Sequence, residues 1–179
     1  IHMKITVITG SPHKNGTSAR LAEEFIKGAE SAGHEVFRFD GAFKNLHPCI
    51  ACEKCHKTNS GCAFKDDMQE LDPHLLESDG IVFVSPIYYY DVTAQIKAVI
   101  DRFYANDAAL HNEKKTALLV TMADDSKGTA DGAVASFEGT AKFMGWEIVG
   151  TVIGVDCADV QLLEKTDYPR QAYELGKNF

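Results

Sequence analysis

Residues 3–18 read MKITVITGSPHKNGTS. This stretch begins with a short apolar run that ends at Gly10, continues as a polar loop, and opens a segment of helical periodicity from Thr17 to Ala32. Strand, loop and helix is the arrangement that this pattern predicts. The same alternation recurs along the chain, so the first unit indicates how the whole sequence is organised.

Extending this pattern gives five strands that alternate with five helices. We expect strands at 3–10, 34–39, 80–85, 116–121 and 147–155, and helices at 17–32, 67–77, 92–104, 132–144 and 168–177. The first, third and fourth strands are apolar on both faces, as parallel strands are when helices cover each side. The sequence therefore predicts an α/β fold with a doubly wound parallel sheet and right-handed crossovers.

Composition bounds the class of protein. The 179 residues are 45% hydrophobic and 25% charged, and we expect one domain over 3–179, with Ile1 and His2 as an expression remnant. The net charge of −8 without a long basic block disfavours nucleic acid and anionic membranes as partners. No apolar run reaches the roughly 18 residues of a membrane helix, and no leader precedes the first strand, so we expect a cytoplasmic protein.

In a doubly wound sheet, ligands bind beyond the carboxyl ends of the strands, where the strand order reverses. The loop at 10–18 is the first candidate, because its backbone N–H groups, its hydroxyls and its amide can surround a phosphate at a helix N-terminus. Neither the Walker pattern nor the dinucleotide glycine fingerprint is present. The alternative is an ordinary helix capped by Thr17 or Asn15. The residues that could contact the phosphate are Ser11, His13, Lys14, Asn15, Gly16, Thr17 and Ser18.

The loop after the third strand carries Pro86 and Ile87 followed by three tyrosines, Tyr88, Tyr89 and Tyr90. Three consecutive aromatic residues cannot share one face of an element, so at least one is expected to face a ligand or a partner subunit. A planar ring system with polar edges would suit such a loop. An aromatic dimer patch is the alternative, and the two interpretations are compatible.

Together these two loops resemble those of a known family. The motifs GSPxxNGT at 10–17, SPIY at 85–88 and TAQIKAVIDR at 93–102 are similar to those of the NAD(P)H-dependent FMN reductases of flavodoxin-like fold. The resemblance implies a sheet of order 2-1-3-4-5 with helices on both faces, bound FMN, and a homodimer or homotetramer. It implies FMN phosphate at Ser11, Asn15, Thr17 and Ser18, and the isoalloxazine ring against Pro86, Ile87, Tyr88 and Tyr89. Asp124, after the fourth strand, is expected to shape the ring pocket.

A cysteine-rich insertion is expected at 41–65. It contains Cys49, Cys52, Cys55 and Cys62, whose close spacing suits a four-thiolate shell. Both a [4Fe-4S] cluster and zinc accept such ligands, and three cysteines this close favour the cluster. Within the family, the spacing resembles that of the iron-sulfur flavoproteins. Free thiols or a disulfide remain alternatives, and Cys157 is expected to be a core thiol.

No acid–base or nucleophile set is evident, which is expected if a cofactor carries the chemistry. The hypothesis is an FMN-dependent oxidoreductase that takes hydride from NAD(P)H and passes electrons to a second acceptor, through a [4Fe-4S] cluster where one is bound. Without a cluster the acceptor would be a quinone, an azo or nitro compound, or free flavin. The alternatives are an electron carrier of flavodoxin type that does not oxidise nicotinamide, and a zinc-stabilised interaction module.

Overall fold

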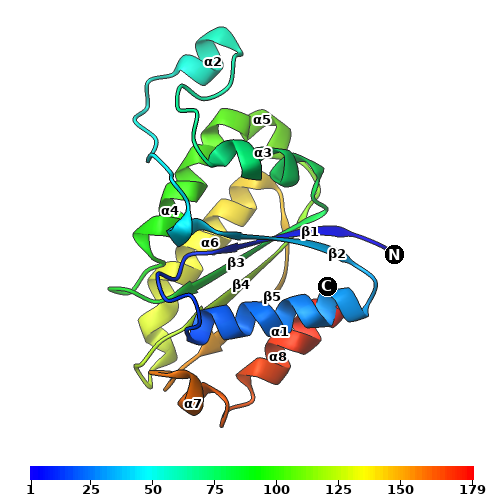
Figure 1. Ribbon diagram of the computed structural model, residues 1–179, viewed down its shortest axis with the longest axis vertical. Coiled ribbons are helices and arrows are strands. Elements are labelled where there is room, and N and C mark those ends of the chain that lie inside the picture. Colours follow the sequence, from blue (N-terminus) through cyan, green and yellow to red (C-terminus); the bar gives the residue numbers. More distant parts are fainter.

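The computed structural model describes residues 1–179 and is built on a sheet of five parallel strands. Their order is β2-β1-β3-β4-β5, and helices cover both faces (Figure 1). This confirms the predicted α/β fold and its strand order. The strands are β1 Lys4–Thr9, β2 Glu35–Asp40, β3 Gly80–Pro86, β4 Lys115–Thr121 and β5 Glu147–Gly154.

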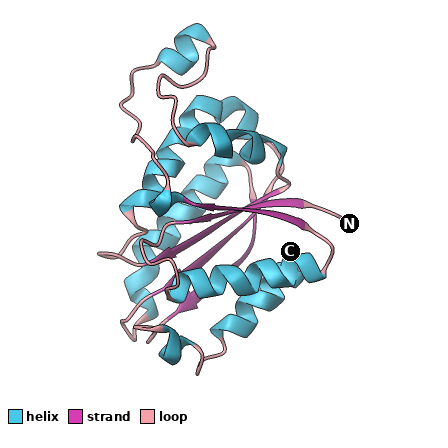
Figure 2. Cartoon of the chain, in the orientation of Figure 1, coloured by secondary structure: helices cyan, strands magenta, loops and turns pink.

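The helices connect these strands and lie in two layers (Figure 2). None of them is long and apolar enough to cross a membrane. The α-helices are α1 Thr17–Ser31, α2 Lys54–Thr58, α3 Met68–Glu77, α4 Ala94–Asp101, α5 Asp107–Leu110, α6 Asp131–Met144, α7 Val160–Leu163 and α8 Tyr168–Lys177. The 3-10 helices are η1 Gly41–Phe43, η2 Arg102–Asn106 and η3 Lys127–Ala130.

The sheet divides the core into two apolar clusters. Alternate residues of β3 point to opposite faces: Val82 and Val84 pack with α1 and α8, whereas Ile81 and Phe83 pack with α3, α4 and α6. This explains why the strand is apolar throughout. The helices α1 and α8 lie side by side on one face (Figure 1).

The crossovers create a reversal point between two neighbouring strands. After β1 the chain turns to α1 on one face of the sheet, and after β3 it turns to α4 on the other face. Because β1 and β3 are adjacent and parallel, their following loops separate and leave a crevice at their carboxyl ends.

Two details differ from the sequence-based prediction. The helix expected at 92–104 is α4 followed by the tighter η2, and the short helices α2, α5 and α7 were not predicted. Helices of four or five residues contain too few turns to give a hydrophobic period, so the sequence carries little signal for them.

Candidate functional site

The loops that leave β1 and β3 are fastened to each other. The N–H of Gly10 donates to the carbonyl of Val84 at 2.9 Å, which extends the β1–β3 pairing by one residue. The Thr93 hydroxyl donates to the Gly10 carbonyl at 2.6 Å, and the Thr93 N–H donates to the Ser85 hydroxyl at 3.1 Å. The crevice between the two loops therefore has rigid walls.

The N-terminus of α1 opens into this crevice without a side-chain cap. Gly16 is the N-cap residue and offers no side-chain oxygen, and no acidic residue lies in the first turn. The Ser11 hydroxyl accepts from the His13 N–H at 3.0 Å, and the Gly16 N–H donates to the His13 carbonyl at 3.2 Å, so the loop is tightly folded. The capped-helix alternative, with Thr17 or Asn15 as cap, is not observed. The first-turn N–H groups are left available to an anion.

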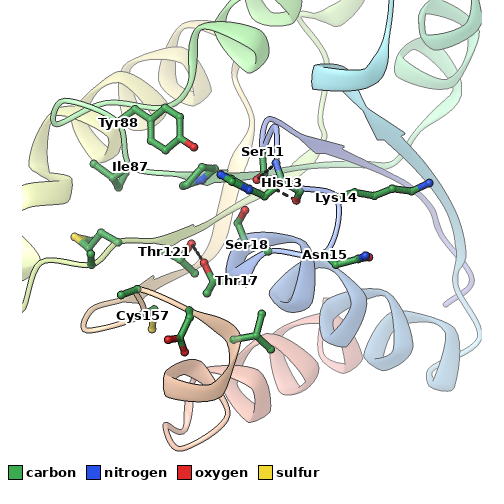
Figure 3. Close-up of a pocket in the computed structure, with 17 residues that line it drawn as sticks. Ser11, His13, Lys14, Asn15, Thr17, Ser18, Ile87, Tyr88, Thr121 and Cys157 are labelled. Carbon is green, nitrogen blue, oxygen red and sulfur yellow. Dashed lines mark hydrogen bonds between the residues drawn. The ribbon is translucent and has the colours of Figure 1, made fainter.

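A cleft of about 620 Å³ lies at this edge of the sheet, within the size range of small-molecule sites (Figure 3). We call it the switch-point cleft. It brings together most of the cofactor-contact residues that the sequence analysis proposed: Ser11, His13, Lys14, Asn15, Gly16, Thr17, Ser18, Pro86, Ile87 and Tyr88. In Figure 3, Tyr88 and Ile87 border the cleft on the side opposite Thr17 and Thr121.

The remaining lining was not proposed from the sequence. It comes from the end of β4 and from the segments that follow β4 and β5: Thr121, Met122, Ala123, Cys157, Ala158, Asp159 and Val160. The hydroxyls of Thr17 and Thr121 lie 2.8 Å apart and form a hydrogen bond across the floor. The segment after β5 carries no recognisable sequence motif.

Cys157 belongs to both the core and the cleft. It packs in the cluster beneath α1 and α8, as expected for a core thiol, and it also lines the switch-point cleft. Its Sγ donates to the Val155 carbonyl at 3.0 Å. Burial raises the pKa of the Cys157 thiol, so the neutral form is favoured at the cleft wall.

Two residues proposed from the sequence do not line the cleft. Asp124 instead organises its own loop, because its carboxylate accepts from the Ser126 N–H at 3.0 Å and from the Thr129 hydroxyl at 2.9 Å. These hydrogen bonds lower the pKa of Asp124, and the one from the Ser126 N–H has the largest effect. Tyr89 is 99% exposed and points away from the protein surface.

The tyrosine loop is a strained two-residue turn. Tyr88 and Asp91 exchange backbone hydrogen bonds of 2.9 and 3.2 Å, while Tyr89 and Tyr90 have φ angles of 48° and 69°. Both central residues are left-handed, the pattern of a type I′ turn, where Asn-Gly is usual. Bulky residues hold this conformation at a cost of about 1 kcal/mol or more each, and such strain is typical of functional sites.

The charged groups of the cleft favour an anion at the α1 end. His13 and Lys14 line that end, and the one acidic lining residue, Asp159, caps α7 by accepting from the Leu162 N–H at 2.8 Å. Arg20, near the start of α1, is paired with Glu24 and with Glu164, the latter at 2.6 Å. Arg20 therefore does not serve the cleft.

The cysteine insertion forms a separate feature beyond the top of the fold in Figure 1, where it carries α2. Cys49, Cys52, Cys55 and Cys62 all line one small apolar hollow, which we call the cysteine hollow. Left-handed residues at Ala51 (φ 53°) and Glu53 (φ 61°) turn the chain on either side of Cys52. These turns explain how cysteines close in sequence come to surround one point.

The cysteine hollow encloses only about 20 Å³, roughly the space of one water molecule. All five cysteines are free thiols, and burial raises the pKa of Cys55. No group of three or more His, Cys, Asp or Glu side chains is gathered closely enough to hold a single metal ion. The donor set is that of a thiolate-ligated cluster, and binding one would require the four thiols to rearrange from the positions they have here.

The fold and the switch-point cleft define a class of nucleotide-binding α/β protein, in which an anion sits at a helix N-terminus beside the strand reversal. The chain belongs to the NADPH-dependent FMN reductase family, whose model matches residues 3–154.

Among individual relatives, several are named iron-sulfur flavoproteins. The chain is 38% identical over 100 residues to an iron-sulfur flavoprotein of Archaeoglobus fulgidus, covering 56% of this chain and 45% of that one. It is 32% identical over 121 residues to an iron-sulfur flavoprotein of Methanosarcina thermophila, covering 66% of this chain and 63% of that one. The chain thus spans about half to two thirds of the length of these relatives.

Solved structures share the fold over almost the whole chain. An NAD(P)H:quinone oxidoreductase from Methanothermobacter marburgensis superposes with a TM-score of 0.79 at 19% identity, covering 99% of this chain and 96% of that one. An NADH:FMN oxidoreductase in its apo form superposes with a TM-score of 0.71 at 21% identity, covering 98% of this chain and 87% of that one. At these identities the likeness establishes the fold.

Proposed function

We propose that the protein is an FMN-dependent oxidoreductase that takes hydride from NAD(P)H and passes the electrons to a second acceptor. The observation that carries this proposal is the uncapped N-terminus of α1, which opens into a cleft lined by hydroxyls, Lys14 and His13. Membership of the FMN reductase family supports FMN as the occupant.

The residues of the cleft divide between the two ends of FMN. We assign the phosphate to the first-turn N–H groups of α1 and to Ser11, Asn15, Thr17 and Ser18. The isoalloxazine ring is assigned to Pro86, Ile87 and Tyr88. Tyr89 lies outside the cleft and would contact the ring only if the strained turn moved toward it. Tyr88 is 43% exposed, so part of its ring is free to contact a ligand.

Bound FMN would supply the hydride and single-electron chemistry. The protein has to bind the cofactor, orient it and exclude competing groups. The Thr93 hydrogen bonds to Gly10 and Ser85 hold the phosphate loop and the ring loop at a fixed separation. Cys157, whose thiol is neutral, and Met122 add apolar groups to the lining of the cleft.

We further propose that Cys49, Cys52, Cys55 and Cys62 hold a [4Fe-4S] cluster. Support comes from the four thiols around one hollow and from the names of the curated relatives. The segment 44–65 contains four Lys and one Glu in a chain of net charge −8, so it is locally positive and suits an anionic cluster. Few backbone hydrogen bonds hold 48–52, so little main-chain structure opposes a rearrangement of this part of the loop.

The second acceptor and the assembly belong to the same proposal. With a cluster bound, electrons would leave singly; without one, a quinone, an azo or nitro compound, or free flavin would stack on the ring. We propose a homodimer or homotetramer in which the exposed rings of Tyr89 and Tyr90 meet a partner subunit.

Anaerobic mixing of the FMN-loaded protein with NADH or NADPH tests the activity. Loss of the oxidised flavin absorbance on a catalytic timescale is expected with at least one nicotinamide. A flavin that binds but stays oxidised with both would identify an electron carrier instead. A protein that ignores FMN and contains stoichiometric zinc would identify the interaction module.

A further inference from the structure

One buried cation fastens both ends of the cysteine insertion. Arg102, the first residue of η2, is 3% exposed. Its guanidinium donates to both carboxylate oxygens of Asp66, at 2.7 and 3.1 Å, and to the carbonyl of His47 at 2.7 Å. The His47 N–H donates to the same carboxylate at 2.9 Å. His47 and Asp66 flank the four cysteines, so one side chain closes the loop that carries them.

The tip of the insertion is fastened to the same 3-10 helix. The His56 ring lies 2.8 Å from the Tyr104 carbonyl, and the Tyr104 hydroxyl donates to the Glu53 carboxylate at 2.9 Å. The base and the tip of the insertion both rest on η2. Arg102 therefore occupies the junction between the insertion and the body of the fold.

Arg102 also borders the cysteine hollow. It is one of the residues that line the hollow together with the four cysteines, and its guanidinium carbon lies 5.5 Å from the centre of the Phe64 ring. Its Nε is buried and has no hydrogen-bond partner. Burying an N–H donor without an acceptor costs about 1–3 kcal/mol of folding free energy. The unpaired Nε–H of Arg102 therefore suggests that a group bound in the hollow accepts a hydrogen bond from it.

We propose that Arg102 is the positioning residue of the cysteine hollow and the charge partner of the anionic group that the four cysteines hold. The proposal rests on the iron-sulfur function proposed above. The Asp66 carboxylate fixes the guanidinium, and the fixed guanidinium sets the span of the loop. Its positive charge stabilises the more negative, reduced state of a thiolate-ligated cluster and so raises the reduction potential.

Limited proteolysis of the metal-free protein tests the positioning role, because Lys54 and Lys57 offer trypsin sites within the insertion. Arg102→Gln is expected to raise cleavage there by about tenfold or more, with FMN binding unchanged. The matched control is Arg170→Gln, which removes an exposed two-pronged ion pair with Asp167 on α8. Equal cleavage in wild type and Arg102→Gln would overturn the positioning role.

Anaerobic reconstitution with iron and sulfide tests the charge role. Arg102→Gln should bind less iron per chain and lower the midpoint potential of the cluster that remains. Arg102→Lys keeps the positive charge but lacks the paired N–H donors of the guanidinium. Its cluster should therefore have a midpoint potential close to that of the wild type, whereas its insertion should be cleaved almost as fast as in Arg102→Gln. An unshifted potential in Arg102→Gln would overturn the charge role.

The two assays separate the failure of this inference from that of the proposed cluster. A wild-type protein that takes up no iron would defeat the cluster and the charge role together, while proteolysis would still decide the positioning role. If circular dichroism shows that Arg102→Gln does not fold, both roles are judged on Arg102→Lys. A rate of tryptic cleavage equal to that of the wild type would then overturn the positioning role. A midpoint potential far from that of the wild type would overturn the charge role.

Discussion

The hydroxyl of Thr93 donates a 2.6 Å hydrogen bond to the carbonyl of Gly10, a residue 83 positions earlier in the chain. Thr93 is also the N-cap of α4, where its side chain accepts from the Ile96 N–H. One fully buried side chain thus joins the start of a helix on one face of the sheet to the loop that opens the helix on the other face. The geometry of the switch-point cleft depends on this connection.

Replacing Thr93 by Val removes the cap and leaves the Gly10 carbonyl without its hydroxyl partner. We expect the free energy of unfolding to fall by about 1–3 kcal/mol and FMN affinity to fall with it. Denaturant titrations with and without FMN measure both effects. Thr93→Ser keeps the hydroxyl and serves as the control; a Thr93→Val protein as stable as Thr93→Ser would contradict this account.

Gly10 is needed because α4 approaches it closely. A Cβ at this position would lie 2.5 Å from the Thr93 hydroxyl oxygen and 2.7 Å from the Ile96 Cβ. Gly10→Ala should therefore push the phosphate loop away from α4 and weaken FMN binding by tenfold or more, which corresponds to about 1.4 kcal/mol. Fluorescence titration of FMN measures the loss.

The control for Gly10→Ala is Gly139→Ala, in α6, where an added Cβ would meet nothing within 4 Å. This substitution should leave FMN affinity unchanged and stabilise the protein by about 0.5–1 kcal/mol, since Ala favours helix over Gly. Similar FMN affinities in the two variants would show that the close approach of α4 to Gly10 does not determine how tightly the cleft binds FMN.

Asp72, on α3, should make stability depend on pH. Burial raises the pKa of Asp72 to about 6, an effect that Arg102 opposes, and its Oδ1 has no hydrogen-bond partner. The pKa in the unfolded chain is about 3.9, so the folded state holds this proton more tightly. The contribution of the protonated Asp72 carboxyl to the free energy of unfolding is fully present below about pH 4. It is lost as the pH rises through about 6, where the buried carboxyl ionises.

Asp72→Asn should accordingly raise the free energy of unfolding at pH 8 by about 1–2 kcal/mol, with little effect at pH 4. Urea titrations across this range provide the measurement. Asp167→Asn should show the opposite trend, because hydrogen bonds from Arg170 lower the pKa of Asp167. A constant difference between Asp72→Asn and wild type at every pH would refute the assignment.

The strained tyrosine turn should lower the free energy of unfolding while it presents Tyr89 to a ligand or a partner subunit. Tyr89→Gly relieves a left-handed residue, so we expect a gain of about 0.5–1 kcal/mol in unfolding free energy. If Tyr89 contacts the flavin ring or a partner subunit, the same variant should lose FMN affinity or dissociate. Tyr89→Phe retains the ring and should behave like wild type. A Tyr89→Gly protein with unchanged binding and assembly would remove Tyr89 from the site.

The fold was predictable because the buried strands have a recognisable sequence pattern. Segments such as ITVIT and IVFVS are apolar on both faces, and only a sheet covered on each side accommodates them. The phosphate loop followed from Gly10 and Gly16 with the hydroxyls between and beyond them. The sequence did not distinguish a capped α1 from an open one, since that depends on which residue becomes the N-cap, and the structure has Gly16 there.

The rest of the site depended on contacts that no local pattern encodes. The segment 157–160 reaches the switch-point cleft only because β5 pairs with β4, and Asp124 turns to its own loop because Ser126 and Thr129 offer closer donors. The ion pair between Arg102 and Asp66 joins residues 36 positions apart. Sequence spacing gives no signal for such pairs.

The most direct test compares FMN with riboflavin by titration calorimetry on the apoprotein. The two ligands share the isoalloxazine ring and differ in the phosphate, which the account assigns to the open N-terminus of α1. We predict one FMN per chain, bound at least about a hundredfold more tightly than riboflavin, a difference of about 2.7 kcal/mol. Equal affinities, or no heat with either ligand, would contradict the central claim.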